Sequence, residues 1–356
     1  MKILFITRKY PPQVGGMENY SYGLISNISC HKHIIALKHS RFHIIWFLPY
    51  AFLKSLFLFW RVDIIYLCDA LLAPVGYLLK VITRKPVFVT AHGLDITYRK
   101  YFYQKINTPF LKKMDRVFAV SQNTVEECVK KGVKRKKCRF IPNGVDVPSE
   151  GTKYQRADLE KFLDMSLENE KIILSVGRLI PRKGVEWFIN NVVEKLPSEV
   201  VYIVAGEGPK REEIEHAVHD RGLGNRVFIV GRVGDEEREM LFQTADVFVM
   251  PNIRVDSDVE GFGIVAIEAA IQGLPVMASN IEGINDAIIE GHNGFLVESG
   301  NAQAFEEKIR DLLFKTDLEK LSAQIKDYTT RHYSWSYVSD LYLQEFKQWE
   351  KKKKAK

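Results

Sequence analysis

The sequence has few cysteines, none of them arranged for a metal, and no export signal before its first apolar segment. The four cysteines show no C-x-x-C pair or other zinc-ligand spacing, which excludes a zinc-finger module; they are Cys30, Cys68, Cys128 and Cys138. Met1 and Lys2 run directly into Ile3–Ile6, an apolar run too short for a secretory signal. We therefore expect a reduced, cytosolic protein with free thiols.

Acidic residues are scarce in the first part of the chain. Residues 1–150 carry 24 Lys and Arg against 9 Asp and Glu, whereas the remainder carries 27 against 35. A basic half favours an acidic partner, which can be nucleic acid, an anionic membrane surface or a phosphorylated acceptor. The densest cluster, Lys130–Lys131 with Lys134–Lys137, can also be only a solvated loop. No helix-turn-helix, RNP-like aromatic motif or finger spacing accompanies the charge, which argues against nucleic acid.

One apolar segment approaches the length of a membrane span. Fifteen of the nineteen residues in Phe42–Trp60 are apolar or aromatic, but Pro49 and Lys54 interrupt the run and Arg41 and Arg61 flank it. A spanning helix would place the first strand and the rest of its domain on opposite sides of a bilayer. We expect instead a buried helix of the first domain. An aromatic face resting in the membrane interface stays open as the alternative.

The remaining apolar runs alternate with helical patterns, and this alternation is typical of parallel sheets covered on both faces. The expected strands of the first half are Lys2–Thr7, Asp63–Cys68, Pro86–Ala91, Arg116–Ser121 and Cys138–Ile141. Those of the second half are Lys171–Val176, Val200–Ala205, Arg226–Val230, Asp246–Met250, Pro275–Ala278 and Gly294–Val297. With 356 residues, the pattern predicts an α/β fold of two Rossmann-like, doubly wound domains. A charged stretch at about 147–170 is the predicted linker, and a helix is expected near Trp335–Lys351.

Two carboxylates frame a glycine-rich turn in the second half. Glu260 precedes Gly261-Phe262-Gly263, and Glu268 lies inside the apolar helix that follows. Free N–H groups at such a turn can bind an anion, and the carboxylates can accept hydrogen bonds from neighbouring hydroxyls. A ligand that presents both a diphosphate and sugar hydroxyls is a nucleotide sugar. A capped helix with a surface glutamate at each end is the alternative for this motif taken alone.

Two further strands of this half end in glycine-rich loops. The first ends at Gly177 and is followed by Arg178 and Lys183, and the second leads into Gly206-Glu207-Gly208. Ligands of α/β sheets bind outside the carboxyl ends of strands, where these cations would meet phosphate oxygens. The order and spacing of the pieces, more than any one of them, indicate a diphosphate site.

With these motifs in place, the sequence resembles the retaining glycosyltransferases of family 4, which have the two-domain GT-B fold. The resemblance covers residues 1 to about 300 and is carried by Gly15-Gly16, Ala91-His92-Gly93-Leu94-Asp95, Ser121, Pro142-Asn143-Gly144-Val145-Asp146, Gly177-Arg178, Lys183-Gly184, Gly206-Glu207-Gly208, Glu260 to Glu268, Gly273-Leu274-Pro275-Val276 and Gly291-His292-Asn293-Gly294-Phe295-Leu296-Val297. It implies an acceptor-side domain at 1–150 and a nucleotide-sugar domain at 151–334 across a central cleft. It also implies that the terminal helix, about 335–356, packs back onto the first domain.

The resemblance assigns roles in the second domain. Arg178 and Lys183 would neutralise the diphosphate as it leaves. Glu268 would accept from the ribose hydroxyls and Glu260 from the transferred sugar. The backbone of Gly177, Gly206, Gly261, Phe262 and Gly263 would complete the donor site.

In the first domain, Gly15 and Gly16 would let the backbone approach the phosphate, since they have no Cβ. His92 would face the sugar near the reacting centre. A lone histidine is more often structural, but this one ends a strand, so we favour a functional role. Asp95, Ser121 and Asn143 are weaker candidates for the cleft.

Retention of the anomeric configuration would follow from the resemblance. The acceptor hydroxyl would attack from the face that the diphosphate leaves, so no enzyme nucleophile is needed, and Glu260 with Glu268 is not an acid/base pair of the hydrolase type. The cations and the helix N-terminus can replace a divalent metal, so we expect neither metal nor cofactor.

The acceptor is the least determined part. Basic and aromatic character together favour a lipid-linked sugar or growing cell-surface glycan, as in lipopolysaccharide, capsule or exopolysaccharide biosynthesis, with peripheral contact to the inner face of the plasma membrane. Two alternatives share the scaffold. One is a GT-B sugar-nucleotide epimerase or phosphorylase, and the other is a catalytically silent partner subunit. The donor base, the sugar and the linkage cannot be read from the sequence.

Overall fold

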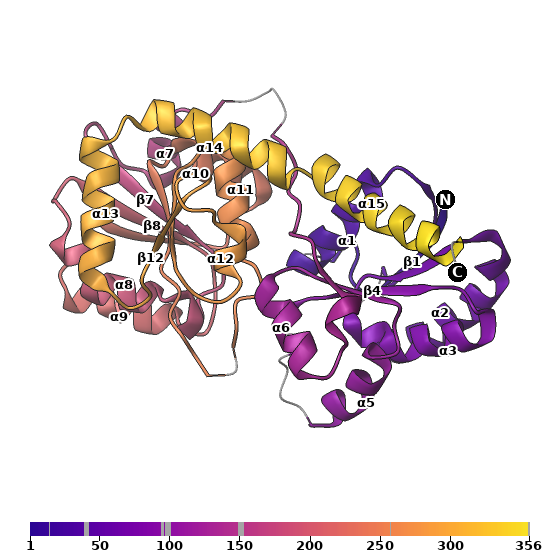
Figure 1. Cartoon of the computed structure of the whole chain (residues 1–356). Helices are drawn as coiled ribbons and strands as arrows, with labels where there is room; N and C mark the ends of the chain where they lie inside the picture. Colours follow the sequence, from indigo (N-terminus) through magenta and orange to yellow (C-terminus); the bar gives the residue numbers. More distant parts are fainter. Residues whose placement is uncertain are drawn as a thin grey trace. The chain divides into compact units, whose positions relative to one another are not determined.

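The computed structural model describes residues 1–13, 15–38, 43–93, 96, 101–148, 153–256 and 258–354. The chain forms two compact units (Figure 1). The first comprises Met1–Asp146, Ser257–Phe262 and Tyr333–Lys356, and the second Val147–Asp256 and Gly263–His332.

The first unit is built on a six-stranded parallel sheet in the order β2-β1-β3-β4-β5-β6. Its strands are β1 (Lys2–Thr7), β2 (His31–Ala36), β3 (Ile64–Leu67), β4 (Val87–Ala91), β5 (Arg116–Ala119) and β6 (Cys138–Phe140). Its helices are α1 (Gly16–Asn27), α2 (Ile44–Leu58), α3 (Ala73–Thr83), α5 (Tyr101–Leu111), α6 (Gln122–Lys130) and α15 (Trp335–Lys354), with short 3₁₀ turns η2 (Phe59–Arg61), η3 (Ala70–Leu72) and η4 (Arg135–Lys137).

Successive side chains of these strands point to opposite faces of the sheet, so the sheet contributes to two separate cores. On one face, Phe5, Tyr66 and Phe118 pack with residues of α1 and α15. On the other, Leu4, Leu67 and Val89 pack with α2, α3, α5 and α6, as Figure 1 shows for α2 and α3. The C-terminal helix is therefore part of the first unit's core, although residues 141–334 separate it from β6 in the sequence.

The second unit repeats the plan with a parallel sheet in the order β12-β11-β10-β7-β8-β9. Its strands are β7 (Lys171–Val176), β8 (Val200–Ala205), β9 (Val227–Gly231), β10 (Val247–Met250), β11 (Val276–Ser279) and β12 (Phe295–Val297). Its helices are α7 (Arg156–Leu163), α8 (Val185–Asn191), α9 (Arg211–Asp220), α10 (Asp235–Thr244), α11 (Ile264–Gln272), α12 (Ile284–Ala287), α13 (Ala302–Lys315) and α14 (Leu318–Tyr333), with 3₁₀ turns η5 (Pro181–Lys183) and η6 (Val193–Lys195).

The structure corrects three expectations from the sequence. Strand β2 was not predicted, because its sequence HKHIIA begins with polar residues and lies at the sheet edge. The stretch at 147–170 is not only a linker, because it contains α7, which packs against α10. Helix α2 is not buried as a whole: Phe47 is 4% exposed, whereas Trp46 beside it is 76% exposed.

Candidate functional site

In the second unit, the loops after β7 and β8 are joined by backbone hydrogen bonds. The amide of Gly177 donates to the carbonyl of Ala205 at 2.9 Å, and that of Leu179 donates to Glu207 at 2.9 Å. Gly206 has φ of +155°, and a Cβ there would lie 1.8 Å from the carbonyl oxygen of Gly177. Only glycine fits at this position, so the two loops form one glycine-lined edge.

The two predicted cations lie at this edge. Arg178 is exposed and Lys183 is half-buried. The Cε of Lys183 lies 3.6 Å from the place that a Cβ of Gly177 would take, so the lysine side chain extends over the glycine backbone. Both cations line a pocket with Gly177 and Asn252, and the volume of that pocket is about 20 Å³. This is room for about one water molecule, so the pocket itself does not enclose an anion as large as a diphosphate.

Helix α11 is short, apolar and preceded by a left-handed glycine. Gly263 is its N-cap, with φ of +81°, and no acidic side chain lies in the first turn. Alanines of the helix are buried, whereas Glu268 is half-buried. The first N–H groups of a helix have no acceptor within it, so this end favours an anion.

The residues just before α11 belong to the first unit. Glu260 is half-buried, and Phe262 is 3% exposed, with its ring centroid 6.4 Å from that of Tyr333. A Cβ on Gly93 would lie 2.9 Å from the Cα of Gly261, so these two glycines allow a close backbone approach. The two glutamates of the motif thus fall in different units, Glu260 in the first and Glu268 in the second.

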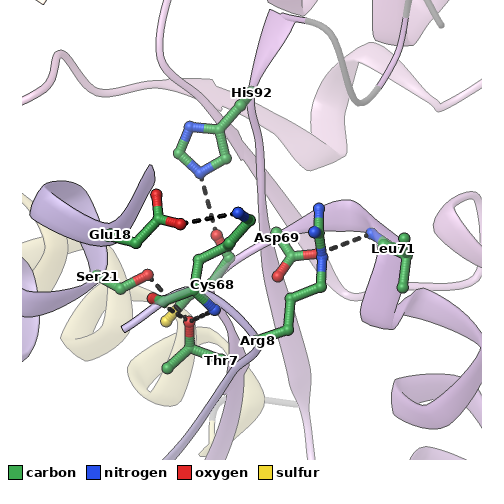
Figure 2. Close-up of polar contacts among 9 residues, drawn as sticks. Thr7, Arg8, Glu18, Ser21, Cys68, Asp69, Leu71 and His92 are labelled. Carbon is green, nitrogen blue, oxygen red and sulfur yellow. Dashed lines mark hydrogen bonds and ion pairs between the residues drawn. The ribbon is translucent and has the colours of Figure 1, made fainter. Parts of the chain in front are cut away.

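His92 follows β4 and is 9% exposed. Its Nε2 lies 3.1 Å from the carbonyl oxygen of Cys68, which follows β3 (Figure 2). A carbonyl only accepts, so Nε2 carries the proton and donates. The Tyr20 ring meets the imidazole edge-on at 4.8 Å between centroids. The histidine is therefore held in one orientation and one tautomer at the carboxyl end of the sheet.

Two ion pairs near His92 were not predicted from the sequence. Lys9 donates to Glu18 at 2.7 Å, and Arg8 donates through Nε to Asp69 at 2.9 Å. Figure 2 shows Arg8, Glu18 and Asp69 with His92. Arg8, Asp69 and His92 follow the neighbouring strands β1, β3 and β4, and Glu18 lies in α1. The carboxylate side chains are 5% and 1% exposed, respectively. Glu18, three residues after Gly15, was the only available signal, since a carboxylate in a first helical turn complements the dipole.

The two adjacent glycines at the start of α1 have different surroundings. A Cβ on Gly15 would lie 2.6 Å from Oε2 of Glu18, whereas a Cβ on Gly16 would meet nothing within 4 Å. Gly15 therefore makes room for the glutamate, and Gly16 faces open space.

The weaker candidates have varied surroundings. Ser121 is buried and caps α6, accepting from the amide of Thr124 at 3.0 Å. Its hydroxyl also pairs with that of Thr124, so its interactions are those of a helix cap. Asn143 is half-buried, and its Oδ1 has no hydrogen-bond partner among the described residues. Asp95 lies outside the described residues.

Metal ligands are the remaining question for this site. Across the described ranges, no group of three His, Cys, Asp or Glu side chains is placed to hold an ion. Two aspartates in an Asp-x-Asp triplet can hold a divalent metal, and the sequence contains one such triplet, Asp256-Ser257-Asp258. The sequence motifs therefore give no argument against a metal. Metal independence stays a prediction that rests on the cations and the helix N-terminus.

The chain matches two family models that together span most of its length. Residues 4–148 match "Glycosyltransferase Family 4", and residues 160–332 match "Glycosyl transferases group 1". An uncharacterized glycosyltransferase of Methanocaldococcus jannaschii is 26% identical over 95% of this chain and 96% of that protein. A GDP-mannose-dependent alpha-(1-6)-phosphatidylinositol monomannoside mannosyltransferase of Mycobacterium tuberculosis is 27% identical, and the match covers 56% of this chain and 53% of that enzyme.

Solved structures share the architecture. Anabaena HepE, solved in complex with UDP-glucose, superposes with a TM-score of 0.77 at 19% identity, covering 98% of this chain and 100% of that one. Sucrose-phosphate synthase of Thermosynechococcus elongatus gives a TM-score of 0.76 at 22% identity, with 98% of each chain covered. At these identities the likeness is one of fold.

Proposed function

Because this chain belongs to glycosyltransferase family 4, and its two Rossmann-like domains have the GT-B fold, we propose that it transfers a hexose-type sugar from a nucleoside-diphosphate sugar to a hydroxyl acceptor. We propose further that the reaction retains the anomeric configuration and requires no divalent metal. The acceptor is a lipid-linked or growing cell-surface glycan.

One observation carries the donor proposal. Lys183 extends over Gly177 beside the exposed Arg178, at an edge whose backbone is glycine on both loops. Diphosphate oxygens can approach such a backbone closely, and with a diphosphate bound there both cations would lie where negative charge develops as it leaves. Preorganised charge of this kind is worth about 3–4 kcal/mol per donor in transition-state stabilisation.

The donor base is open among three nucleotides. The Anabaena HepE structure holds UDP-glucose, the mycobacterial relative is named for GDP-mannose, and a plant starch synthase structure with this fold holds ADP. These observations support a nucleotide-sugar donor without selecting the base.

The retention proposal needs no enzyme nucleophile. If the acceptor hydroxyl attacks on the face that the diphosphate leaves, the leaving group itself can take the proton. His92, whose Nε2–H is engaged by the Cys68 carbonyl, then positions the sugar rather than acting as a nucleophile. Glu260 and Glu268 bind hydroxyls in this scheme.

The acceptor proposal rests on charge and apolar surface together. The first 150 residues are strongly basic, and apolar side chains of α2 are exposed. A lipid-linked acceptor presents anionic phosphate next to apolar chains, as undecaprenyl-diphosphate oligosaccharides and lipopolysaccharide core do. The protein would therefore act on the cytoplasmic side, in peripheral contact with the membrane.

The alternatives make different products. An epimerase on this scaffold would release a free sugar or altered nucleotide sugar without acceptor, and a phosphorylase would need inorganic phosphate or pyridoxal phosphate. A silent partner subunit would bind its partner and turn nothing over.

The donor proposal is tested by thermal unfolding with UDP, GDP or ADP, each in EDTA and in magnesium. A nucleotide at about a hundred times its dissociation constant stabilises the fold by about 2.7 kcal/mol. One responding nucleotide in EDTA is the expected result. A response that requires magnesium would contradict metal independence, and no response at all would favour the silent subunit.

Catalysis is tested with Glu260→Ala, using the matching nucleotide sugar. We expect kcat/KM to fall about 100-fold with nucleotide binding retained, because the lost contacts are to the transferred sugar. Glu212→Ala is the matched control, since Glu212 is exposed on α9. Unchanged turnover in Glu260→Ala would remove this residue from the mechanism.

A further inference from the structure

Helix α2 is apolar around its whole circumference but is packed on only one side. Its buried residues are Phe47, Ala51 and Ser55, which recur every four residues on one stripe. Large exposed side chains recur at helical spacing on another stripe, which continues into η2; these are Trp46, Tyr50, Leu53, Phe57 and Trp60, between 50% and 76% exposed. A helix with this composition is normally buried or in contact with lipid.

Helix α3 adds to the same surface. It packs against α2 on the same side of the first sheet. Its own outward residues, Leu78, Val81 and Ile82, are 49%, 58% and 57% exposed, whereas Leu79 is buried. We call these eight exposed side chains of α2, η2 and α3 the α2–α3 face. Clustered apolar exposure on neighbouring helices marks an interaction surface.

Helices α2 and α3 themselves carry charge of one sign, and Asp115 pairs with Lys80 of α3 at 2.7 Å. Residues 19–62 and 70–93 contain no Asp or Glu. The same helices and their ends carry Lys54, Arg61, Arg84 and Lys85, of which the first three are exposed. Near the end of α3, burial and the charge of Lys80 lower the pKa of Lys137, and the carboxylate of Asp115 opposes this shift.

Two of the four cations at Lys134–Lys137, part of the densest cluster in the sequence, are engaged within the unit. Arg135 pairs with Glu126, and Nζ of Lys137 donates to the carbonyls of Lys112 and Met114 at 2.9 and 2.7 Å. These bonds leave less of its charge for a partner than sequence alone indicates. The exposed cations beside apolar side chains are those of α2 and α3.

We propose that the α2–α3 face docks on an anionic lipid bilayer, with α2 lying in the plane of the interface. Aromatic and aliphatic side chains would enter the headgroup region, and the lysines and arginines would meet lipid phosphates. A span is unfavourable because α2 is fixed to its own domain through Phe47, Ala51 and Ser55. A second copy is a poorer occupant, since a symmetric interface would bring two acid-free, basic surfaces together.

The position of α3 is compatible with the proposed acceptor, and this step rests on the proposed function. Helix α3 starts at Ala73, four residues after Asp69, so its first turn lies near the edge of the sheet where His92 follows β4. The α2–α3 face begins further along the same helix, at Leu78. An acceptor whose lipid stays in the bilayer would present its head group near that edge of the sheet.

The test measures partition of the full-length protein onto sedimenting vesicles of phosphatidylcholine, with and without phosphatidylglycerol. Trp46→Ser and Phe57→Ser should each lower the partition coefficient about tenfold. Arg61→Gln and Lys85→Gln should each lower binding to anionic vesicles about fivefold. Phe314→Ser and Lys320→Gln are matched controls on the second unit, where Phe314 is 43% exposed.

Nucleotide-dependent thermal stabilisation of each variant separates docking from the transferase proposal. A variant with reduced partition onto vesicles but unchanged stabilisation by nucleotide supports docking through the α2–α3 face. Wild-type partition in both aromatic variants would overturn the proposal, even if the transferase activity is established. Absence of vesicle binding by the wild type would also overturn it. A dimer in light scattering that Trp46→Ser and Phe57→Ser together dissociate would then assign the face to a second copy.

Discussion

Lys183 is the residue whose position most directly suggests a catalytic role. Its side chain extends over Gly177 at the glycine-lined edge. We expect Lys183→Ala to lower kcat/KM about 100- to 1,000-fold, because charge placed at a leaving diphosphate acts mainly in the transition state. Steady-state kinetics with the responding nucleotide sugar measure this.

Arg221→Ala is the control for Lys183→Ala. Arg221 is a cation of the same unit, and its partner is Glu194 at 2.9 Å, with both side chains about half exposed. Exposed pairs of this kind contribute at most about 1 kcal/mol to stability, so activity should be unchanged. Equal losses in the two variants would point to instability rather than to a missing phosphate contact.

Gly16 allows a structural role to be separated from a binding role. A Cβ at this position meets nothing within 4 Å, and the residue is the first of α1. Gly16→Ala should keep or raise the free energy of unfolding, by up to about 1 kcal/mol. If the backbone here approaches the donor phosphate, the same methyl should raise KM for the nucleotide sugar severalfold. Unchanged KM in a stable Gly16→Ala protein would remove Gly16 from the donor site.

At the scale of elements, buried hydroxyls join α15 to the first sheet. The hydroxyl of Tyr20 lies 2.9 Å from that of Tyr66, 2.7 Å from that of Thr90 and 2.8 Å from that of Tyr342 on α15. Burial raises the pKa of Tyr342 to about 12 and raises those of Tyr20 and Tyr66 well above their usual value. A raised tyrosine pKa means that the folded protein holds the proton more tightly than the unfolded chain.

Stability from these tyrosines should be complete below about pH 10 and should decline as pH rises towards 12. Tyr342→Phe should lower the free energy of unfolding by about 1–3 kcal/mol at neutral pH, because buried hydroxyls are left with fewer hydrogen-bond partners. Because one titrating group is removed, the free energy of unfolding should also decline less steeply between about pH 9 and 11.5 than in the wild type. Urea unfolding at both pH values measures this. The control is Tyr337→Phe, at a 38% exposed position of the same helix; a decline as steep in Tyr342→Phe as in that control would contradict the assignment.

The sequence predicted elements best where strands are buried on both faces. The predicted bounds of β7 and β8 agree with the structure, since their apolar runs are continuous and end in glycine. It failed for β2, an edge strand with exposed His31 and Lys32, because edge strands need no apolar pattern. For α2, composition predicted a helix, but how much of it is covered depends on neighbours that no local pattern reveals.

The same limit applies to the site. Gly177, Arg178, Lys183 and Gly206 come together as expected, because parallel strands place consecutive strand-end loops at one edge. The pairs Lys9–Glu18 and Arg8–Asp69 were missed, and the second joins residues 61 positions apart. A pair between residues so far apart in the sequence cannot be predicted without knowing which strands are neighbours in the sheet.

At the scale of the whole molecule, α15 follows the second unit in sequence but packs in the core of the first unit. Trp335, Val338, Tyr342 and Phe346 are at most 4% exposed, in the core formed with α1, β1, β3, β4 and β5. The second unit has its own core, to which α15 contributes no residue among those described.

A chain ending at Ser334 should therefore lose the first unit and keep the second. Loss of four large buried side chains, at about 2–5 kcal/mol each, exceeds or matches the 5–15 kcal/mol that stabilises a typical domain. Limited proteolysis should digest residues 1–146 and leave a protected fragment close to 153–332, with about half the cooperative unfolding signal. A chain ending at Glu350, which lacks only the lysine-rich tail, should keep both units. Protection of residues 1–146 in the shorter chain would mean that α1 and the sheet hold this core without α15.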